Sequence, residues 1–567
     1  MEYAIFGALI VAFIMAVIIK DILNDRKKRR EFEQKLRKEF GTFSKKELKP
    51  ERFVRVNKYF LKHPEEGQID DVTWNDLGMD EIFAVLNRTY SASGEEYLYH
   101  ALRSVGKDEE FMAQTEGLIR FFLENEEERV HVQLIMAKLG YMGKYSLYDY
   151  LDNLDYLGER SSKKDWIING LLLASFCIMP FAFSYGLIAA VCITVYNVMA
   201  HFRKKNEIEP YIISFAYILK LLNAAEKMEK LPGLKKNAMF HKNLQSLEEC
   251  RKRMRELEKG AFWVTAGNGS LGGNPVDLLV DYAKMTLHVD LIQFNKMLKV
   301  LRENASAVDE INTILGRFET TIAIASFRKE LENANGYCVP KLWEGKNVRL
   351  FMEEGYHPLL KTPVKNTLRA DGGILLTGSN ASGKSTFLKT VAINAVLAQT
   401  IHTCTAKTYE APYFRIYSSM SLRDDLESGD SYYIVEIKAL KRILNAAKEA
   451  GRPVLCFVDE VLRGTNTVER IAASTQVLKS LHGGNVLCCA ATHDVELTHL
   501  LENIYDNYHF EEEIADGDIL FQYKLLKGRA TTRNAISLLE IIGYDEEIVS
   551  SARDMAERFV KDGTWSL

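Results

Sequence analysis

The chain has 567 residues, of which 47% are apolar and 26% are charged. This length exceeds what one hydrophobic core supports, so two or three folded units are expected. The formal net charge of -4 excludes a globally basic nucleic-acid binder but leaves local basic patches open. The eight cysteines show no C-x-x-C spacing, which favours free thiols in a reducing compartment over a disulfide framework or a metal site.

Two uncharged stretches point to a membrane. Residues 3–19 precede the basic cluster Arg26–Arg30, an order typical of an uncleaved anchor with its N-terminus outside. Residues 166–202 contain Pro180 and Gly186 near their middle, which predicts two short helices joined by a turn. Basic residues flank this stretch on both sides, so both of its ends are expected in the cytoplasm. The alternatives are a signal-peptide core for the first stretch and a buried helical pair for the second.

The middle of the chain has a helical pattern, and the C-terminal part alternates. Over residues 80–140 and 208–331, apolar residues recur at three- and four-residue spacing, which predicts helices. From about residue 347, short apolar runs alternate with helical patterns, which indicates an α/β domain on a largely parallel sheet. The strands expected there include residues 374–377, 454–458 and 486–490.

A phosphate-loop pattern follows the first of these strands. Residues Gly378–Ser385 fit G-x-x-x-x-G-K-[ST] and stand between an apolar run and a helical pattern. The backbone N–H groups of such a loop point at one phosphate cluster at the helix N-terminus. Lys384 is expected to reach the β- and γ-phosphates, and Ser385 to ligate Mg²⁺. The sequence therefore predicts a site for ATP or GTP with Mg²⁺.

Three further polar groups follow the loop in an order that suits nucleotide hydrolysis. Asp459 and Glu460 end an apolar run, where Asp459 is expected to hold Mg²⁺ through water and Glu460 to orient and deprotonate the attacking water. Ser428 opens a Ser-Gly pair that offers a hydroxyl and N–H groups to a second phosphate. His493 follows the next strand and is expected beside the γ-phosphate, although a histidine at a strand end is often structural.

The order of these motifs is shared by ABC-type ATPases, and their details closely resemble the MutS family of mismatch-repair ATPases. Met79–Glu95 also looks like the start of that family's helical core, and the resemblance covers roughly residues 75–555. The runs that carry it are Gly378–Thr386, Asp424–Glu436, Asp459–Thr467, Ala491–Leu497 and Lys527–Ala535.

The resemblance implies ATP hydrolysis at two composite sites of a homodimer, with Ser428 acting on the partner's nucleotide. It also implies that Tyr523 presents its ring to adenine, and that DNA is a partner. The family's mismatch-reading domain finds no room before the helical core, so direct mismatch reading is not expected. The residues expected to contact ATP are Gly378, Ser379, Asn380, Ala381, Ser382, Gly383, Lys384, Ser385, Thr386 and Tyr523; those expected in catalysis are Glu460, His493 and Ser428; those expected at Mg²⁺ are Ser385 and Asp459.

We predict an α/β phosphate-loop ATPase domain of the ABC type behind an all-α lever domain, with an N-terminal transmembrane helix and an inserted transmembrane hairpin. The expected parts are an anchor (1–20), a charged juxtamembrane segment (21–68), a first lever part (69–165), the hairpin (166–202), a second lever part (203–345), the ATPase domain (346–556) and a tail (557–567).

The function expected is that of a MutS-like ATPase anchored by about three helices in a bacterial-type inner membrane, with the ATPase domain cytoplasmic. ATP binding would be coupled to DNA binding or clamping. The alternative is an ABC-type membrane ATPase whose levers act on a protein or lipid partner.

Overall fold

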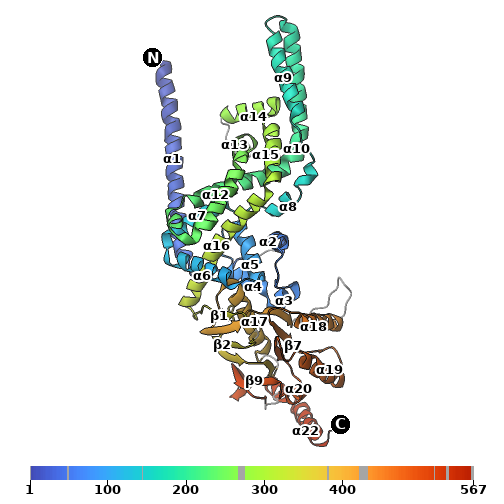
Figure 1. Ribbon diagram of the computed structural model, residues 1–567. Helices are drawn as coiled ribbons and strands as arrows, with labels where there is room; N and C mark the ends of the chain where they lie inside the picture. The colour runs from blue at the N-terminus through green and yellow to red at the C-terminus, as the bar shows by residue number, and fades with distance from the viewer. Residues whose placement is uncertain are drawn as a thin grey trace. The chain divides into compact units, whose positions relative to one another are not determined.

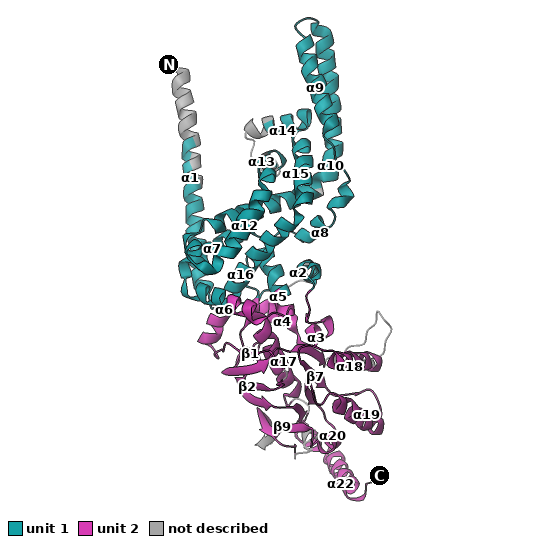
Figure 2. Ribbon diagram, in the orientation of Figure 1, with its two compact units in different colours: residues 1–64, 87–100, 117–327 teal, residues 65–86, 101–116, 328–567 magenta. Residues whose placement is uncertain are grey.

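The computed structural model describes residues 2–47, 50–143, 145–265, 275–345, 347–379, 382–420, 432–515, 518–530 and 535–563. The chain forms two compact units, each assembled from segments that are distant in sequence (Figure 2). Unit 1 comprises residues 1–64, 87–100 and 117–327, and unit 2 comprises residues 65–86, 101–116 and 328–567.

Helices make up most of the chain before residue 334, as the apolar spacing predicts (Figure 1). In chain order the helices are α1 (Glu2–Glu39), α2 (Pro50–Lys62), α3 (Asp71–Leu77), α4 (Met79–Leu86), α5 (Ala92–Arg103), α6 (Glu109–Glu124), α7 (Glu126–Leu139), α8 (Leu147–Leu151), α9 (Lys163–Ile178), α10 (Phe183–Glu229), α11 (Pro232–Lys236), α12 (His241–Arg253), α13 (Arg255–Thr265), α14 (Pro275–Leu287), α15 (Val289–Glu303), α16 (Ala305–Asn333), α17 (Lys384–Ile401), α18 (Tyr432–Lys448), α19 (Thr467–Ser480), α20 (Val495–Leu500), α21 (Ala535–Ile542) and α22 (Glu546–Asp562).

In unit 1, α5 and α16 approach each other so closely that two glycines are required. A Cβ on Gly316 would lie 2.5 Å from the carbonyl oxygen of Ser93, and one on Gly94 would lie 2.1 Å from Oε2 of Glu319. The hydroxyl of Ser93 donates to Asn312 Oδ1 across the same contact, at 2.6 Å. Small residues at the contact therefore let polar groups of the two helices bond inside the core.

The second uncharged stretch forms a helical hairpin, but only its first helix is short. The turn occupies residues 179–182, and α10 then runs for 47 residues, through Pro210 and well beyond the apolar stretch. The expectation of two short helices is therefore wrong for the second one. Within the described part of the chain, Phe183–Glu209 is the one helical segment long and apolar enough to cross a membrane, judged by length and composition.

Unit 2 contains two sheets. The six-stranded sheet has the order β10-β9-β4-β8-β7-β6, and the strands from β9 to β6 pair in parallel, which confirms the predicted largely parallel sheet. The second sheet has the order β1-β5-β2-β3 and was not anticipated from the sequence, because its strands are short and only partly apolar. The strands are β1 (Lys341–Trp343), β2 (Leu350–Gly355), β3 (Asn366–Ala370), β4 (Gly373–Thr377), β5 (Thr408–Pro412), β6 (Arg415–Ser419), β7 (Val454–Asp459), β8 (Val486–Ala491), β9 (Tyr505–Ala515) and β10 (Asp518–Lys527).

Helix α3, far upstream in sequence, belongs to unit 2 because it docks on edge strand β6. Oδ2 of Asp76, which is 3% exposed, accepts hydrogen bonds from the hydroxyl of Ser418 at 2.7 Å and from the backbone N–H of Met420 at 2.9 Å. Arg442 on α18 forms an ion pair with Asp70 at 2.5 Å. The boundary between the two units therefore does not follow the linear division expected from the sequence.

We predict that Asp76→Ala destabilises unit 2, since it leaves two buried donors without their acceptor. Such a loss costs about 2–4 kcal/mol, and we expect the midpoint of thermal unfolding to fall by roughly 5 °C or more in calorimetry of the full chain. Asp371→Ala is the matched control, because Asp371 is exposed and pairs with Arg369, which is exposed as well. An equal effect of both substitutions would contradict a docking role for Asp76.

Candidate active site

Two glycines of the loop between β4 and α17 have the positive φ values that suit an anion-binding turn. Gly378 has a φ of 146° and Gly383 a φ of 103°, values that disfavour residues with a side chain. A Cβ on Gly378 would also lie 2.9 Å from the carbonyl oxygen of Phe510. Lys384 lies at the first turn of α17, where Nζ donates to the carbonyl oxygens of Gly378 and Ser379, each at 2.8 Å. The loop thus directs one ammonium group and the N-terminus of α17 to one point.

Asp459 ends β7 opposite this helix N-terminus. The hydroxyl of Ser385 donates to Asp459 Oδ2 at 2.5 Å. The other carboxylate oxygen, Oδ1, is buried and accepts no hydrogen bond from the residues that the structure describes. Burial raises the pKa of Asp459 above its usual value. An orphaned carboxylate oxygen beside a hydroxyl is a donor set that suits Mg²⁺, so the residues present fit the predicted cation.

Glu460 is fixed from both sides in an uncommon backbone conformation. Its φ is 57°, in the left-handed region, as is that of Leu462 at 58°. One carboxylate oxygen lies 2.9 Å from Nε2 of His493, and the other lies 2.8 Å from Nη1 of Arg463. Glu436 on α18 supports the turn, because its Oε1 accepts a hydrogen bond from the backbone N–H of Leu462. Strained backbone held by several contacts is typical of functional sites.

Burial changes the pKa values of the charged groups at this site more strongly than the neighbouring opposite charges do. Burial lowers the pKa of Lys384, and the carboxylates of Asp459 and Glu460 only partly oppose this effect. Burial, together with the positive charge of Lys384, lowers the pKa of His493. His493 is therefore neutral at pH 7, a state in which its imidazole can both donate and accept a hydrogen bond. A polyphosphate would place compensating negative charge beside Lys384.

A cavity of 510 Å³ opens beside these groups, a volume that suits a nucleotide-sized ligand. Tyr523 enters its wall at a bulge in β10, with a φ of 52°. Asn366 holds this bulge, since its amide donates to the carbonyl oxygen of Tyr523 at 2.9 Å and its Oδ1 accepts from the N–H of Leu525. One part of the wall is polar and another apolar; the apolar residues are Leu360, Val364, Phe387 and Phe510.

The structure gathers most of the predicted site residues around this cavity. Ser379, Gly383, Lys384, Ser385, Thr386, Glu460, His493 and Tyr523 line it. Gly378 stands at the start of the loop, Ser382 is 1% exposed within it, and Asp459 contacts the lining residue Ser385. Asn380, Ala381 and Ser428 lie outside the described residues.

Several residues of the site were missed by sequence reasoning. His357, Asn366 and Phe510 line the cavity, Arg463 binds Glu460, and Glu436 supports its turn. Arg463 and Glu436 lie within the sequence runs that carry the family resemblance, and their position there could have marked them as site residues. Asn366 and Phe510 had no such signal, because their roles arise from strand pairing with distant segments.

Comparison with known proteins places residues 374–560 in a described family. The family model described as MutS domain V matches these residues. The DNA mismatch repair protein MutS of a Thermus thermophilus strain is 33% identical over 257 residues, which are 44% of this chain and 30% of the Thermus protein. The MutS of Aquifex pyrophilus is 31% identical over 254 residues (42% of this chain, 28% of that protein), and that of a Clostridium kluyveri strain is 28% identical over 283 residues (47% and 32%).

Residues 374–560 are therefore similar to domain V of the MutS family. The matched segment spans only 28% to 32% of the length of these three relatives. The similarity to these relatives is therefore limited to one part of the chain, and it does not establish the function of the whole protein.

We predict that Asp459→Asn stabilises the protein when no divalent cation is present. Because burial raises the pKa of Asp459, its ionised form at pH 7 is disfavoured by the fold, and a neutral amide removes that cost. In EDTA the midpoint of thermal unfolding should rise by about 2 °C. Millimolar MgCl₂ should stabilise the wild type and not the variant. Asp371→Asn, at an exposed position, serves as the control.

Destabilisation by Asp459→Asn in EDTA would contradict this prediction. It would mean that Ser385 and Lys384 already compensate the carboxylate and that the fold needs no cation there.

Proposed function

We propose that this chain is a MutS-like ATPase that hydrolyses ATP with Mg²⁺ at the cavity of unit 2 and is embedded in a membrane by its helical hairpin. The observation that carries the ATPase assignment is the Ser385–Asp459 contact, with its buried orphan oxygen, next to the Glu460–His493 pair. A structural role for these residues leaves that oxygen and the strained Glu460 without a purpose. Binding and hydrolysis of a magnesium nucleotide use both.

In this proposal each residue has one task. The loop N–H groups and Lys384 bind the β- and γ-phosphates, and Tyr523 faces the base. Ser385 and Asp459 would hold Mg²⁺, which would supply charge neutralisation at the transferred phosphoryl group. Glu460 accepts a proton from the attacking water, and His493 orients that carboxylate through the 2.9 Å contact. Electrostatic stabilisation by fixed groups provides most of the rate.

The active enzyme in this proposal is a homodimer with two composite sites. Ser428 of the partner subunit completes each site across the interface, as the family resemblance implies. The relatives named above are DNA mismatch repair proteins, which favours DNA as the partner of the helical unit. ATP binding then closes the ATPase domains, and this closure is coupled to DNA binding or clamping.

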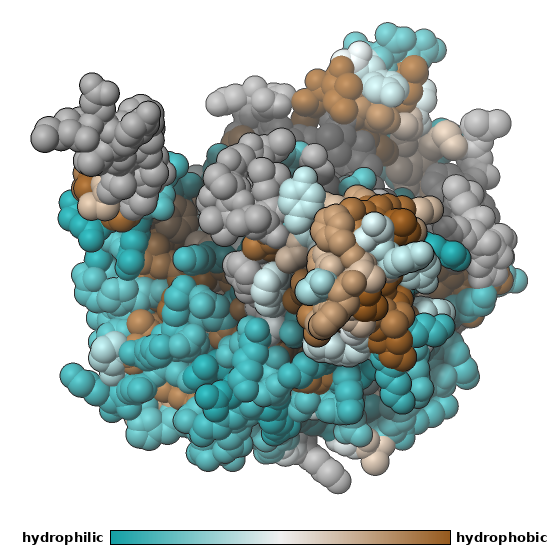
Figure 3. Space-filling view, turned by 90° about the horizontal axis from the view of Figure 1, so that it is seen from above, coloured by the Kyte–Doolittle hydropathy of each residue, from teal (hydrophilic) through white to brown (hydrophobic). Residues whose placement is uncertain are grey.

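The exposed surface of the hairpin supports a membrane. Residues 166–202 carry no formal charge, and the apolar side chains of α9 and α10 face outward, with Phe181 at the turn 92% exposed. Figure 3 shows hydrophobic residues gathered on this projecting part of unit 1. A contiguous exposed apolar surface of this kind marks a site of membrane or protein interaction. The Phe183–Glu209 segment has only 17% of its most apolar window buried, unlike the core helix of a soluble protein.

A cluster of charged residues marks the base of the hairpin. Asp165 Oδ1 lies 2.7 Å from Nζ of Lys204 and 2.7 Å from Nδ1 of His288. His201 Nε2 lies 2.8 Å from Asp290 Oδ2. These pairs fasten the hairpin to the segment that joins α14 and α15 and fix the level at which its apolar surface ends.

The hairpin's length indicates how deeply it enters the bilayer. The 16 residues of α9 extend about 24 Å, less than the hydrocarbon core of roughly 30 Å. No charged residue stands at the turn. The two ends of a hairpin lie on one side of a bilayer, and basic residues flank both ends of this one (Lys163 and Lys164, then Arg203–Lys205). By the positive-inside rule we place both ends, and with them the ATPase, on the cytoplasmic side, with α1 as a separate anchor whose N-terminus is outside.

We predict that Glu460→Gln lowers ATP turnover at least 100-fold while leaving nucleotide affinity within about threefold, since it removes the proton acceptor and not the phosphate contacts. The measurement is steady-state phosphate release by the full-length protein in liposomes, with and without duplex, branched and mismatched DNA. Stimulation by DNA in the wild type, lost in the variant, is the expected result.

The choice of DNA separates the candidate functions. If none of the DNA forms changes the rate of ATP turnover, the DNA-coupled function is wrong. The remaining candidate is then a membrane ATPase that acts on a protein or lipid partner. If the wild type binds nucleotide but does not hydrolyse it, the ATPase assignment itself is wrong.

Two native cysteines test the membrane assignment. Cys177 on α9 and Cys192 on α10 are exposed in the structure, so water would reach them if no membrane covered the hairpin. In intact proteoliposomes we expect a charged maleimide to leave both unlabelled, because maleimides attack the thiolate and a thiol in hydrocarbon does not ionise. Labelling in detergent with urea shows that the thiols are present. Rapid labelling by the charged reagent would show that the hairpin is not embedded.

A further inference from the structure

A second cavity of 510 Å³ lies within unit 1 and has no part in the proposed ATPase chemistry. Its walls come from the last turns of α1 and the segment that follows it, from α2, from the connection between α4 and α5, from the end of α7 with Tyr141, and from α16. The volume lies within the range of small-molecule sites.

Basic side chains dominate its wall. Lys35, Lys46, Arg52 and Arg88 line it, against two carboxylates, Glu39 and Glu47. Lys35 and Glu39 are four residues apart on α1 and lie 3.7 Å from each other, so their charges offset one another. The other charged side chains of the wall are three basic ones and the carboxylate of Glu47. The charge therefore favours an anionic ligand.

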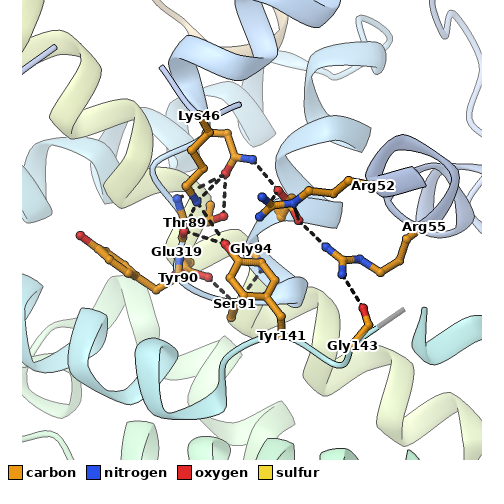
Figure 4. Close-up of polar contacts among 12 residues, drawn as sticks. Lys46, Arg52, Arg55, Thr89, Tyr90, Ser91, Gly94, Tyr141, Gly143 and Glu319 are labelled. Atoms are coloured by element: carbon orange, nitrogen blue, oxygen red, sulfur yellow. Dashed lines mark hydrogen bonds and ion pairs between the residues drawn. The ribbon is translucent and has the colours of Figure 1, made fainter. Parts of the chain in front are cut away.

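A buried network fixes the deep side of this cavity (Figure 4). Arg52 Nε and Arg55 Nη2 donate to the same oxygen of Glu95, at 3.0 and 2.8 Å, and the Glu95 side chain is fully buried. Lys46 Nζ lies 3.1 Å from the hydroxyl of Tyr141 and also binds the carbonyl oxygen of Thr89. The basic groups are thus held in place before any ligand arrives, which reduces the entropic cost of binding.

Two of the cations in the wall are desolvated by the fold. Arg88 donates to the hydroxyl of Ser326 at 2.9 Å, and its guanidinium carbon lies 5.9 Å from the ring centre of Phe327. Burial lowers the pKa of Arg88 to about 10 and also lowers the pKa of Lys46. An anion bound here would favour the charged forms that burial disfavours in both groups.

We propose that this cavity binds a soluble, phosphate-bearing small molecule, with Arg88 and Lys35 as its principal contacts. The planar guanidinium of Arg88 matches two phosphate oxygens at once, and Lys35 adds a mobile ammonium at the rim. Arg52 and Lys46 lie behind them, held in the network and partly neutralised by Glu95 and Glu319.

A lipid headgroup is the other source of such a phosphate, and the geometry of α1 argues against it. Helix α1 is continuous, and the 15 residues from Lys20 to Lys35 extend about 22 Å. If the bilayer ends near Lys20, as the proposed membrane assignment has it, a headgroup does not reach the cavity. A ligand from solution does.

The test uses the full-length Lys384→Ala protein in nanodiscs of neutral lipid, without nucleotide or Mg²⁺, so that pyrophosphate loses the ammonium contact of the phosphate loop in unit 2. Pyrophosphate is the probe, and isothermal titration calorimetry measures its binding. We expect one saturable site per chain, weakened at least tenfold by Arg88→Gln and by Lys35→Gln. Lys38→Gln, an exposed lysine on the same helix that does not line the cavity, should leave the affinity unchanged. Glu47→Gln, which removes a wall carboxylate, should tighten binding a few-fold.

Each other outcome overturns the proposal. If pyrophosphate binds Arg88→Gln and Lys35→Gln as it binds the parent, or gives no saturable heat, the cavity is not a phosphate site. Should anionic lipid in the nanodisc abolish the heat for the parent and not for Lys35→Gln, the headgroup is the ligand. Lys35→Gln carries the test if Arg88→Gln fails to fold, because Lys35 is exposed. Since ATP turnover is not the readout, a failure here is distinct from a failure of the ATPase assignment.

Discussion

The parallel pairing of β4, β8 and β7 is the constraint on which the site of unit 2 depends. Parallel strands end at the same edge of a sheet, and the register aligns Asp459 with Ala491 and Ala491 with Leu376. Each strand is fully or almost fully buried, so a slip by one residue would exchange the side chains packed on its two covered faces and disrupt the packing of both. The register therefore fixes where the loop, the carboxylates and His493 emerge.

Burial of charge is the common physical theme of the two cavities. In unit 2, Lys384 and Asp459 are both held where burial disfavours their ionised forms. In unit 1, Arg88 and Lys46 are in the same condition. A fold that retains such groups loses stability in the absence of a ligand, and it gains affinity for a ligand of opposite charge because the groups are already desolvated and oriented.

The helical unit combines two surfaces of opposite character. Its hairpin exposes apolar side chains down to the level of the Asp165–Lys204 pair, whereas the wall between α1 and α16 is charged. The hairpin's apolar surface follows from a sequence without charge over residues 166–202, and its termination follows from histidine–aspartate contacts that span distant segments.

The sequence by itself determined the local features. The glycines of the phosphate loop, the apolar runs of β4, β7 and β8, and the uncharged stretch of the hairpin each follow from residues close together in the chain. Tertiary structure alone decided what depends on distant segments: the docking of α3 on β6 through Asp76, the bulge that carries Tyr523, and the meeting of Lys46, Arg52 and Arg88 at one cavity. Local patterns encode backbone conformation and burial, but hydrogen bonds between distant residues exist only once the whole chain has chosen its packing.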